Sequence, residues 1–441
     1  MSGRRDDVQP ADPDRRLGGW GGRGSAVSPR GGWSKRLVLP LALLLVAAVI
    51  RLVGVTAERV LVLAGDEFSY DDIATNLAAG NGYCRTSTSG DPYPTATRGP
   101  SYVLFLAVCY RLFGQDSIAP FVVQALLDSV SCLLVYGIAL LLFKRRTIAA
   151  VGAFLYAVYP PFITNTHQLL TETWINVWIL ASLLLFLRYV KAPSRRDLVA
   201  SAVATGIMVL SRPNLLPASI LAFVAMGGRR DARWWRGLAV HFGIVAMCLS
   251  PWIVRNAIVF GRFVPGVSQG GITFWGGTGP AGGRAIGGLG DPETPQYAIE
   301  ATRGMGEMER DRWFYADGVR VIREHPGRYA LLLVKKIPRL WLNLGYDRPP
   351  SRASILLALF NAGMILMAYL GVRGFRPPRV GHTLLLLLGT YFTLTHLVFF
   401  SVFRYSLPVY AVLMPFSGAG IAWMWGFVWS RGGYRVRRDP D

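Results

Sequence analysis

Residues 37–55 read LVLPLALLLVAAVIRLVGV, and this apolar run decides the class of fold. The run is about as long as a bilayer is thick and exceeds the roughly 7–15 residue core of a cleaved signal peptide. We interpret it as a membrane anchor, with cleavage near Val55-Thr56-Ala57 kept as an alternative. The preceding residues 1–34 are rich in Gly, Arg, Asp and Pro, and they predict a disordered basic tail.

The composition extends this interpretation to the whole chain. Its 441 residues are 52% hydrophobic, with 13 Trp and a mean hydropathy of +0.35, which is too apolar for an ordinary soluble protein. The formal charge of +21 resides mostly in short clusters between apolar runs, the distribution that orients membrane helices. We therefore reject nucleic acid as a partner.

The cysteines show neither metal-type spacing nor a disulfide framework; they are Cys84, Cys109, Cys132 and Cys248.

Ten apolar runs of bilayer length or slightly less predict an all-α polytopic integral membrane protein with about ten transmembrane helices across residues 35–430. Ten spans put both termini on one side, where the basic clusters also fall, and an excess of Lys and Arg marks the cytoplasmic side. We predict a multi-pass protein of the plasma or inner membrane whose tails, 1–34 and 431–441, are both cytoplasmic. The ten runs are 37–55, 119–143, 147–163, 172–190, 197–212, 214–227, 237–255, 353–372, 381–400 and 406–429.

A shorter run, residues 101–113, is placed in the outer interface rather than across the membrane. It has only about a dozen residues, and counting it as a span would move the basic cluster 144–146 to the outside. Two large loops, about 56–118 and 256–352, then face outward. We expect the chemistry of the protein to lie in these loops.

The first outer loop contains a predicted interfacial helix. Asp66, Tyr70, Ile73 and Leu77 fall at helical spacing on one face, and Gly80 follows where a helix C-cap is expected. This spacing predicts a short helix lying along the membrane surface.

The second outer loop contains two further predicted helices. Pro295 can open a helix that runs to His325-Pro326. Residues 329–345 combine Lys335, Lys336 and Arg339 with Leu and Ile, and they predict a basic amphipathic helix at lipid headgroups. Membrane lipids are therefore expected partners of this segment.

Asp66 and Glu67 form an acidic pair just beyond the first span. Two charged side chains at the edge of an apolar chain are energetically costly unless they form ion pairs, bind a metal or take part in catalysis. The alternative is an ordinary pair of loop residues in water. The remaining polar residues of the outer face favour the first interpretation, because they collect at span ends and in the outer loops.

Three of those residues are arginines, Arg98, Arg255 and Arg404. Each alone is suited to anchoring at headgroups. A guanidinium fork also suits bidentate contact with phosphate, so three arginines together with an acid predict a site for a lipid-linked phosphate. His167 and Glu172 lie beside the same outer face, although Glu172 could instead cap the span that it begins.

These residues resemble the C-type polytopic glycosyltransferases, in particular the protein O-mannosyltransferases and the aminoarabinose transferase that modifies lipid A. The resemblance covers about residues 37–430, and the motifs stand in the family's order. Gly99 and Val103 depart from the family's common Arg-Pro-Pro-x-Tyr-Pro pattern. The motifs are Asp66-Glu67-x-x-Tyr70, Leu77-x-x-Gly80-x-Gly82-Tyr83, Arg98-x-Pro100-x-Tyr102, Thr171-Glu172, Ser211-Arg212-Pro213, Pro251-Trp252-x-x-Arg255-Asn256 with Gly261, and Arg404-Tyr405-x-x-Pro408.

The resemblance implies transfer of a sugar from a polyprenyl-phosphate donor to a protein, lipid or glycan acceptor on the outer face, with inversion. Asp66 would act as the general base on the acceptor hydroxyl. Glu67 would orient Asp66 or join it in holding a divalent metal, and the cofactor is left open. The residues expected to bind the donor phosphate are Arg98, Arg255, Arg404 and Lys335. The residues expected to line the substrate pocket are Tyr70, Tyr102, His167, Glu172, Asn256 and Tyr405.

A transporter or flippase of lipid-linked sugars is the alternative function. It requires polar residues or broken helices near the membrane midplane, for which Asp128 and His241 are the main candidates. We expect Asp128 to bond a neighbouring helix and His241 to be wet near the cytoplasmic end. No P-loop or zinc protease motif is present in the sequence.

Overall fold

The computed structural model describes residues 32–57, 63, 65–226, 232–345 and 350–431. By internal contacts the chain divides into Met1–Val38 and Leu39–Asp441, and the arrangement described here is that of the second unit. Its first part comprises α1 (Gly32–Ala57), α2 (Asp66–Ala79), β1 (Cys84–Thr86), β2 (Pro92–Pro94), α3 (Pro100–Phe113), α4 (Ala119–Phe143), α5 (Arg146–Val158), α6 (Pro160–Asn165), α7 (Thr171–Lys191), α8 (Arg195–Ser211) and the 3₁₀ helix η1 (Pro213–Leu215).

The second part is also helical. It comprises α9 (Leu216–Met226), α10 (Ala232–Phe260), α11 (Gly270–Gly277), α12 (Gln296–Ala301), α13 (Glu307–Glu324), α14 (Pro326–Leu342), α15 (Arg352–Phe375), α16 (Arg379–Val398), the 3₁₀ helix η2 (Phe403–Ser406) and α17 (Leu407–Arg431). The fold is therefore helical as predicted, apart from one antiparallel hairpin in which Cys84 of β1 pairs with Pro94 of β2.

Seven helices of the described residues are long and apolar enough to cross a membrane, which makes this a multi-pass membrane protein. Three further predicted spans, 147–163, 197–212 and 214–227, correspond to α5, α8 and α9, whose 13, 17 and 11 residues fall short of that length. Ten spans are therefore not confirmed. The seven segments are Leu37–Thr56, Ala119–Phe143, Thr171–Lys191, Ala232–Phe260, Arg352–Phe375, Gly381–Val398 and Phe403–Phe427.

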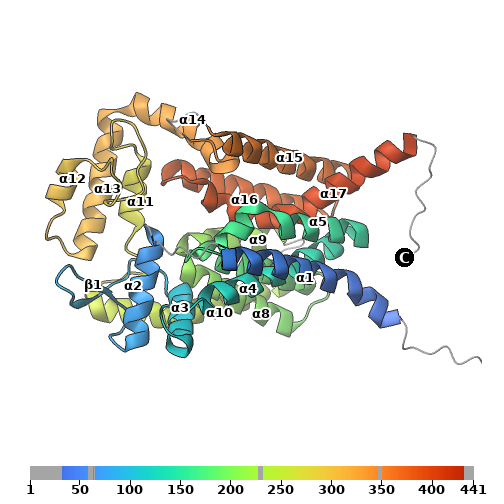
Figure 1. Ribbon diagram of the computed structural model, residues 1–441, viewed down its shortest axis with the longest axis horizontal. Coiled ribbons are helices and arrows are strands. Elements are labelled where there is room, and N and C mark those ends of the chain that lie inside the picture. The colour runs from blue at the N-terminus through green and yellow to red at the C-terminus, as the bar shows by residue number, and fades with distance from the viewer. Residues whose placement is uncertain (1–31, 58–62, 64, 227–231, 346–349, 432–441) are drawn as a thin grey trace, which may run out of the picture. The chain divides into compact units, whose positions relative to one another are not determined.

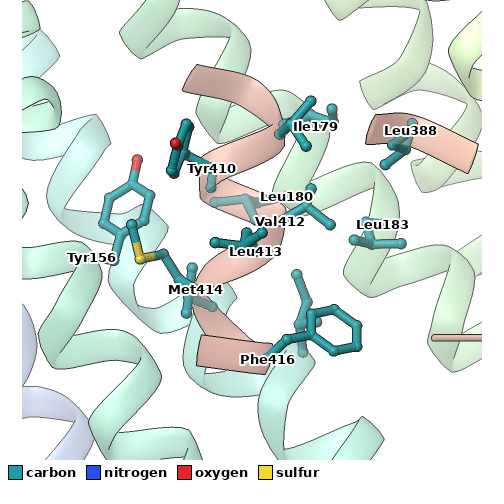
Figure 2. Close-up of a cluster of buried hydrophobic side chains, with 14 of the residues drawn as sticks. Tyr156, Ile179, Leu180, Leu183, Leu388, Tyr410, Val412, Leu413, Met414 and Phe416 are labelled. Atoms are coloured by element: carbon teal, nitrogen blue, oxygen red, sulfur yellow. The ribbon is translucent and has the colours of Figure 1, made fainter. Parts of the chain in front are cut away.

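The last span lies at the centre of the helix bundle. Its most apolar stretch is 78% buried, compared with 22% for the first span. Figure 2 shows Tyr410, Met414 and Phe416 of α17 among side chains of other helices, including Tyr156 of α5 and Leu180 of α7. The final helix is thus the core element around which earlier helices pack.

Glycines let the backbone of α17 approach its neighbours closely. A Cβ atom on Gly420 would overlap the carbonyl oxygen of Met367 in α15, and one on Gly418 would lie 2.5 Å from the Gly152 amide nitrogen in α5. Small residues at such contacts permit the close helix packing that stabilises membrane bundles.

A buried ion pair joins α1 to α4. Arg51 Nε donates to Asp128 Oδ2 at 2.6 Å, with both side chains almost wholly buried, and Tyr156 of α5 donates its hydroxyl to Asp128 Oδ1 at 2.6 Å. Asp128 therefore does bond neighbouring helices, as expected. His241 is buried, so the prediction that it is wet was wrong; it packs against Phe186 instead.

The segments between the spans confirm two predicted helices and correct two boundaries. The helix predicted over 329–345 is α14, which begins at Pro326 and ends at Leu342. α2 ends at Gly80, whose φ of 89° is the predicted left-handed C-cap. The predicted helix from Pro295 to His325 is broken into α12 and α13, because Gly304 adopts a left-handed φ of 77°. α1 begins at Gly32, so residues 32–34 are helical rather than part of the predicted tail. The tails at 1–31 and 432–441 lie outside the described residues.

The helices of the second outer loop pack on one another. Trp275 of α11 is fully buried against Phe314 of α13, with ring centroids 4.8 Å apart, and its indole nitrogen donates to Asp317 Oδ2 at 2.8 Å. Figure 1 shows α11, α12 and α13 with α2 at one end of the long helices. The described parts of the two large loops, 56–118 and 256–352, therefore meet at the same end of the bundle.

Candidate functional site

The carboxylate of Asp66 is held between two guanidinium groups. Arg98 Nη2 donates to Asp66 Oδ1 at 2.6 Å, and Arg404 Nη2 donates to Asp66 Oδ2. The Asp66 side chain is 28% exposed, so the carboxylate can still be reached from outside. The structure thus brings together the predicted base and two of the four predicted phosphate-binding residues.

Local structure explains the position of these groups. Gly65, with a left-handed φ of 57°, turns the chain into α2 so that Asp66 begins the helix. One turn later, Tyr70 presents its ring to Arg98, whose Cζ lies 4.9 Å from the ring centroid. Tyr102 of α3 packs edge-on against Tyr70 at 5.2 Å. Two of the three predicted pocket tyrosines, Tyr70 and Tyr102, are therefore buried next to each other on the Arg98 side of the site.

A second carboxylate, that of Glu172, lies behind Arg404. Glu172 is wholly buried in the first turn of α7; its Oε1 accepts from Arg212 Nη2 at 2.5 Å and lies 3.8 Å from Arg404 Nε. Within the described part of the chain, Glu172 Oε2 has no hydrogen-bond partner. Arg404 therefore bridges two acids, and Glu172 faces the site rather than capping α7.

The ring of Tyr405 contacts two of the arginines. Tyr405 lies beneath both Arg212 and Arg404, with ring centroids 5.1 Å and 5.2 Å from their Cζ atoms, and it stacks on His396 at 5.0 Å. Such cation–π contacts hold a guanidinium group without using its N–H donors. The guanidinium groups of Arg98, Arg212 and Arg404 carry three positive charges, and the carboxylates of Asp66 and Glu172 carry two negative ones. The cluster therefore has one net positive charge, which favours an anionic ligand.

The pKa of Asp66 is set by opposing effects. Burial disfavours the ionised carboxylate, but the charges of Arg98 and Arg404 outweigh burial and hold the pKa of Asp66 below its usual value. Asp66 is therefore ionised at neutral pH. A lowered pKa also makes it a weaker proton acceptor while both arginines remain in contact.

Arg255 and Asn256 lie next to this cluster and stabilise the first outer loop. Arg255 donates to the carbonyl oxygens of Thr95 at 2.7 Å and Tyr83 at 2.8 Å, and also to Asn256 Oδ1 at 3.0 Å. In the described part of the chain it forms no ion pair with an acid. The link to the cluster runs through Tyr83, whose hydroxyl donates to the Arg98 carbonyl oxygen at 2.9 Å.

Lys335 is exposed, and its neighbour Lys336 is the buried lysine. Lys336 Nζ donates to the carbonyl oxygens of Leu397 at 2.5 Å and Phe399 at 3.0 Å, at the end of α16. The sequence-based prediction names Lys335 as a phosphate contact. A stricter use of helical spacing identifies Lys336 as the buried one, since it lies four residues from both Leu332 and Leu340 of the apolar face.

Glu67 and His167 make contacts other than with the Asp66 cluster. Glu67 Oε1 accepts from the Leu169 amide nitrogen at 3.0 Å, and His167 packs so tightly on α1 that a Cβ atom on Gly54 would overlap its ring. Across the described residues, no three His, Cys, Asp or Glu side chains gather as metal ligands do. With both oxygens of Asp66 on arginines, these residues do not fit a metal site.

Besides Arg212, two polar residues that contact the site or the loop next to it have no role in the sequence-based prediction. Gln269 Oε1 accepts from Arg98 Nη1 at 2.7 Å, so the guanidinium fork of Arg98 is shared between Gln269 and Asp66. Glu307 accepts from the Ala96 amide nitrogen at 2.8 Å. Gln269 lies just before α11 and Glu307 begins α13, and no sequence motif marks either position.

The geometry can be compared with known proteins. Residues 97–254 match the dolichyl-phosphate-mannose-protein mannosyltransferase family. This match confirms the resemblance predicted from the sequence. The matched segment of the mannosyltransferase family includes Arg98 and Glu172 but neither Asp66 nor Arg404. No curated protein sequence matches the chain.

Solved structures that match the chain include an oligosaccharyltransferase and an ArnT protein. The oligosaccharyltransferase of Archaeoglobus fulgidus, in complex with zinc and sulfate, matches with a TM-score of 0.53 and 16% identity over 89% of this chain and 50% of that one. This chain therefore spans half the length of that enzyme. ArnT from Cupriavidus metallidurans matches at 16% identity over 89% of this chain and 78% of that one, with TM-scores of 0.41 bound to undecaprenyl phosphate and 0.39 in the apo state. The first match supports the predicted C-type glycosyltransferase fold.

Proposed function

We propose that the protein transfers a sugar from a polyprenyl-phosphate carrier to an acceptor hydroxyl, with inversion at the anomeric carbon. The observation that carries this proposal is the contact of one reachable carboxylate, that of Asp66, with the guanidinium groups of Arg98 and Arg404. A base beside a phosphate-binding pair is what such a transfer requires. The family match supports the same donor chemistry, because the family is named for a sugar linked to dolichyl phosphate.

Asp66 is the general base of the proposed reaction. Its carboxylate takes the proton of the acceptor hydroxyl while the hydroxyl oxygen bonds to the anomeric carbon. The bond from that carbon to the phosphate oxygen breaks, and its electron pair leaves with the polyprenyl phosphate. Attack from the side opposite the phosphate inverts the configuration. A positioned base of this kind contributes about 10²–10⁴ in rate.

Arg98 and Arg404 have two successive partners in this proposal. Before the donor binds they hold Asp66, which keeps it ionised but weakly basic. The donor phosphate then competes for the same N–H donors, and charge-assisted bonds to phosphate are strong. Loss of arginine contacts raises the pKa of Asp66, so the base gains proton affinity when the donor is in place.

The remaining residues serve the same cluster. Glu172 holds Arg404 and Arg212 from the buried side, and Tyr405 supports the two arginines from beneath. A phosphate contact for Arg255 or Lys335 stays a prediction. We place the site on the extracytoplasmic side, with both termini cytoplasmic, because the basic clusters between the predicted spans lie at their opposite ends.

The test uses the purified full chain in lipid nanodiscs with a radiolabelled polyprenyl-phosphate sugar and a cell-envelope acceptor extract. We expect a labelled glycoside of inverted anomeric configuration and release of polyprenyl phosphate. Asp66→Asn should lose product formation about 10²–10⁴-fold. The matched control is Asp71→Asn in the same helix, where the carboxylate bonds Tyr110 instead, and this variant should stay active.

Two results would overturn the proposal. One is transfer at the wild-type rate by a well-folded Asp66→Asn variant. The other is movement of labelled carrier across sealed vesicles without any covalent product, which would favour the transporter alternative.

A further inference from the structure

Helix α13 holds the two chain segments that present Arg98 and Gln269. Glu307 begins α13, and Asp311 lies one turn later on the same face. Both carboxylates accept from backbone N–H groups of the outer loops, Glu307 from Ala96 and Asp311 from Gly271, at 2.8 Å and 2.7 Å. Neither residue is explained by the proposed chemistry itself.

Glu307 contacts both segments at once. Its Oε2 accepts from the Thr95 hydroxyl at 2.7 Å, and its Oε1 accepts from both the Ala96 amide and the Ser268 hydroxyl. The segments are also bonded directly, from the Ser268 amide to the Ala96 carbonyl oxygen at 3.0 Å. One carboxylate therefore fixes the register between two loops that lie far apart in sequence.

That register determines where the Arg98 guanidinium points. Arg98 follows Ala96 by two residues and Gln269 follows Ser268 directly, and the two side chains bond at 2.7 Å. Because Arg98 Nη1 is fixed on Gln269, Nη2 of the same rigid fork is directed at Asp66. On the other side, Arg255 holds the Thr95 carbonyl oxygen.

We infer that Glu307, assisted by Asp311, is a positioning residue that aims Arg98 at the donor phosphate through the register of the two outer loops. The inference rests on the proposed function. The second outer loop thereby becomes part of the donor site, although neither carboxylate touches the substrate.

The experiment compares Glu307→Ala, Glu307→Gln and Glu309→Ala in the full chain, with kcat and KM measured separately for donor and acceptor. Glu307→Ala should raise the donor KM about tenfold while leaving the acceptor KM within about twofold. Glu307→Gln should recover most of the loss, because its amide oxygen can still accept from Ala96 and Ser268. Glu309 is exposed in the same helical turn, so Glu309→Ala should match the wild type.

A double-mutant cycle with Arg98→Ala separates positioning from a general effect on stability. If Glu307 acts through Arg98, Glu307→Ala should add less than about twofold to the donor KM of Arg98→Ala. Equal effects of Glu307→Ala in both backgrounds would overturn the inference, as would an unchanged donor KM in Glu307→Ala. Absence of transfer by the wild type would instead contradict the proposed function. Should Glu307→Ala fail to fold, Thr95→Val removes one of the same bonds and should give a smaller rise in the donor KM.

Discussion

Arg404 and Asp66 lie 338 residues apart in the chain and form an ion pair. Arg404 stands in η2, just before the central helix α17, and Asp66 is the first residue of α2. The site is therefore complete only when the last span has packed into the bundle. Packing of α17 in the core of the bundle therefore determines whether Arg404 can contact Asp66.

Arg404→Lys tests whether the guanidinium group of Arg404 has to reach two acids. A single ammonium group cannot contact Asp66 and Glu172 together as the fork does. We expect a rise in donor KM of about 10- to 100-fold, measured by initial rates at varied donor concentration. The matched control is Arg303→Lys at an exposed position. Wild-type kinetics in Arg404→Lys would show that the bridge is unnecessary.

The pH dependence of transfer should report the environment of Asp66. Because Arg98 and Arg404 lower the pKa of Asp66, its ionised form and the stability that it contributes persist as the pH falls to about 4 and are lost only below that. The acid limb of kcat/KM, which reports the free enzyme, should therefore lie below about pH 4. The acid limb of kcat should lie higher, because the arginines then contact phosphate.

Arg98→Ala tests whether the Arg98 charge sets the pH dependence of kcat/KM. Without the Arg98 charge, the pKa of Asp66 rises toward its usual value and the acid limb of kcat/KM moves to higher pH. Enzyme returned to pH 7 after each exposure controls for irreversible inactivation. An acid limb at the same pH in both proteins would mean that Arg98 does not set the ionisation of Asp66.

Lys336 should make stability depend on pH. Burial lowers its pKa to about 7, so between about pH 7 and 10 the unfolded chain binds more protons than the folded one, and stability rises with pH in that window. The size of the effect is up to about 1.4 kcal/mol per pH unit. Thermal unfolding in detergent should show this rise in the wild type and in the exposed neighbour variant Lys335→Met, but not in Lys336→Met. Identical pH dependence in all three proteins would refute the assignment.

The Arg51–Asp128 pair predicts a strong loss of stability when one partner is removed. Asp128→Asn leaves a buried guanidinium group without its counter-charge, which costs about 3–5 kcal/mol, so the unfolding temperature should fall markedly. The double variant Arg51→Met/Asp128→Leu removes both charges and should recover much of that loss. If the double variant loses as much stability relative to the wild type as the two single changes lose together, the two residues do not act as a pair.

Much of the fold could be predicted because burial in lipid or in the bundle leaves a continuous apolar run. Each of the ten predicted runs overlaps a helix, and the boundary of α2 followed from Gly80. The meeting of Asp66 with Arg98 and Arg404 was also predicted, since all three lie at the same ends of the predicted spans. The number of spans was not settled, because several helices are shorter than a bilayer requires.

The residues that were missed share a physical reason. Gln269 contacts the side chain of Arg98 and Glu307 contacts the backbone amide of Ala96, and such contacts between distant segments leave no period or motif in the sequence. Arg212 was quoted within a motif but given no role, because its partner Glu172 lies 40 residues away. Arg51 was hidden inside an apolar run, where hydropathy alone does not reveal a buried ion pair.

The measurement that tests the central claim most directly is made on Asp66→Asn, with polyprenyl-phosphate affinity and transfer rate determined in the same nanodisc preparation. If Asp66 and the donor phosphate compete for Arg98 and Arg404, removing the carboxylate charge should tighten binding of polyprenyl phosphate while transfer falls about 10²–10⁴-fold. Weaker binding of polyprenyl phosphate, or transfer at the wild-type rate, would contradict the account.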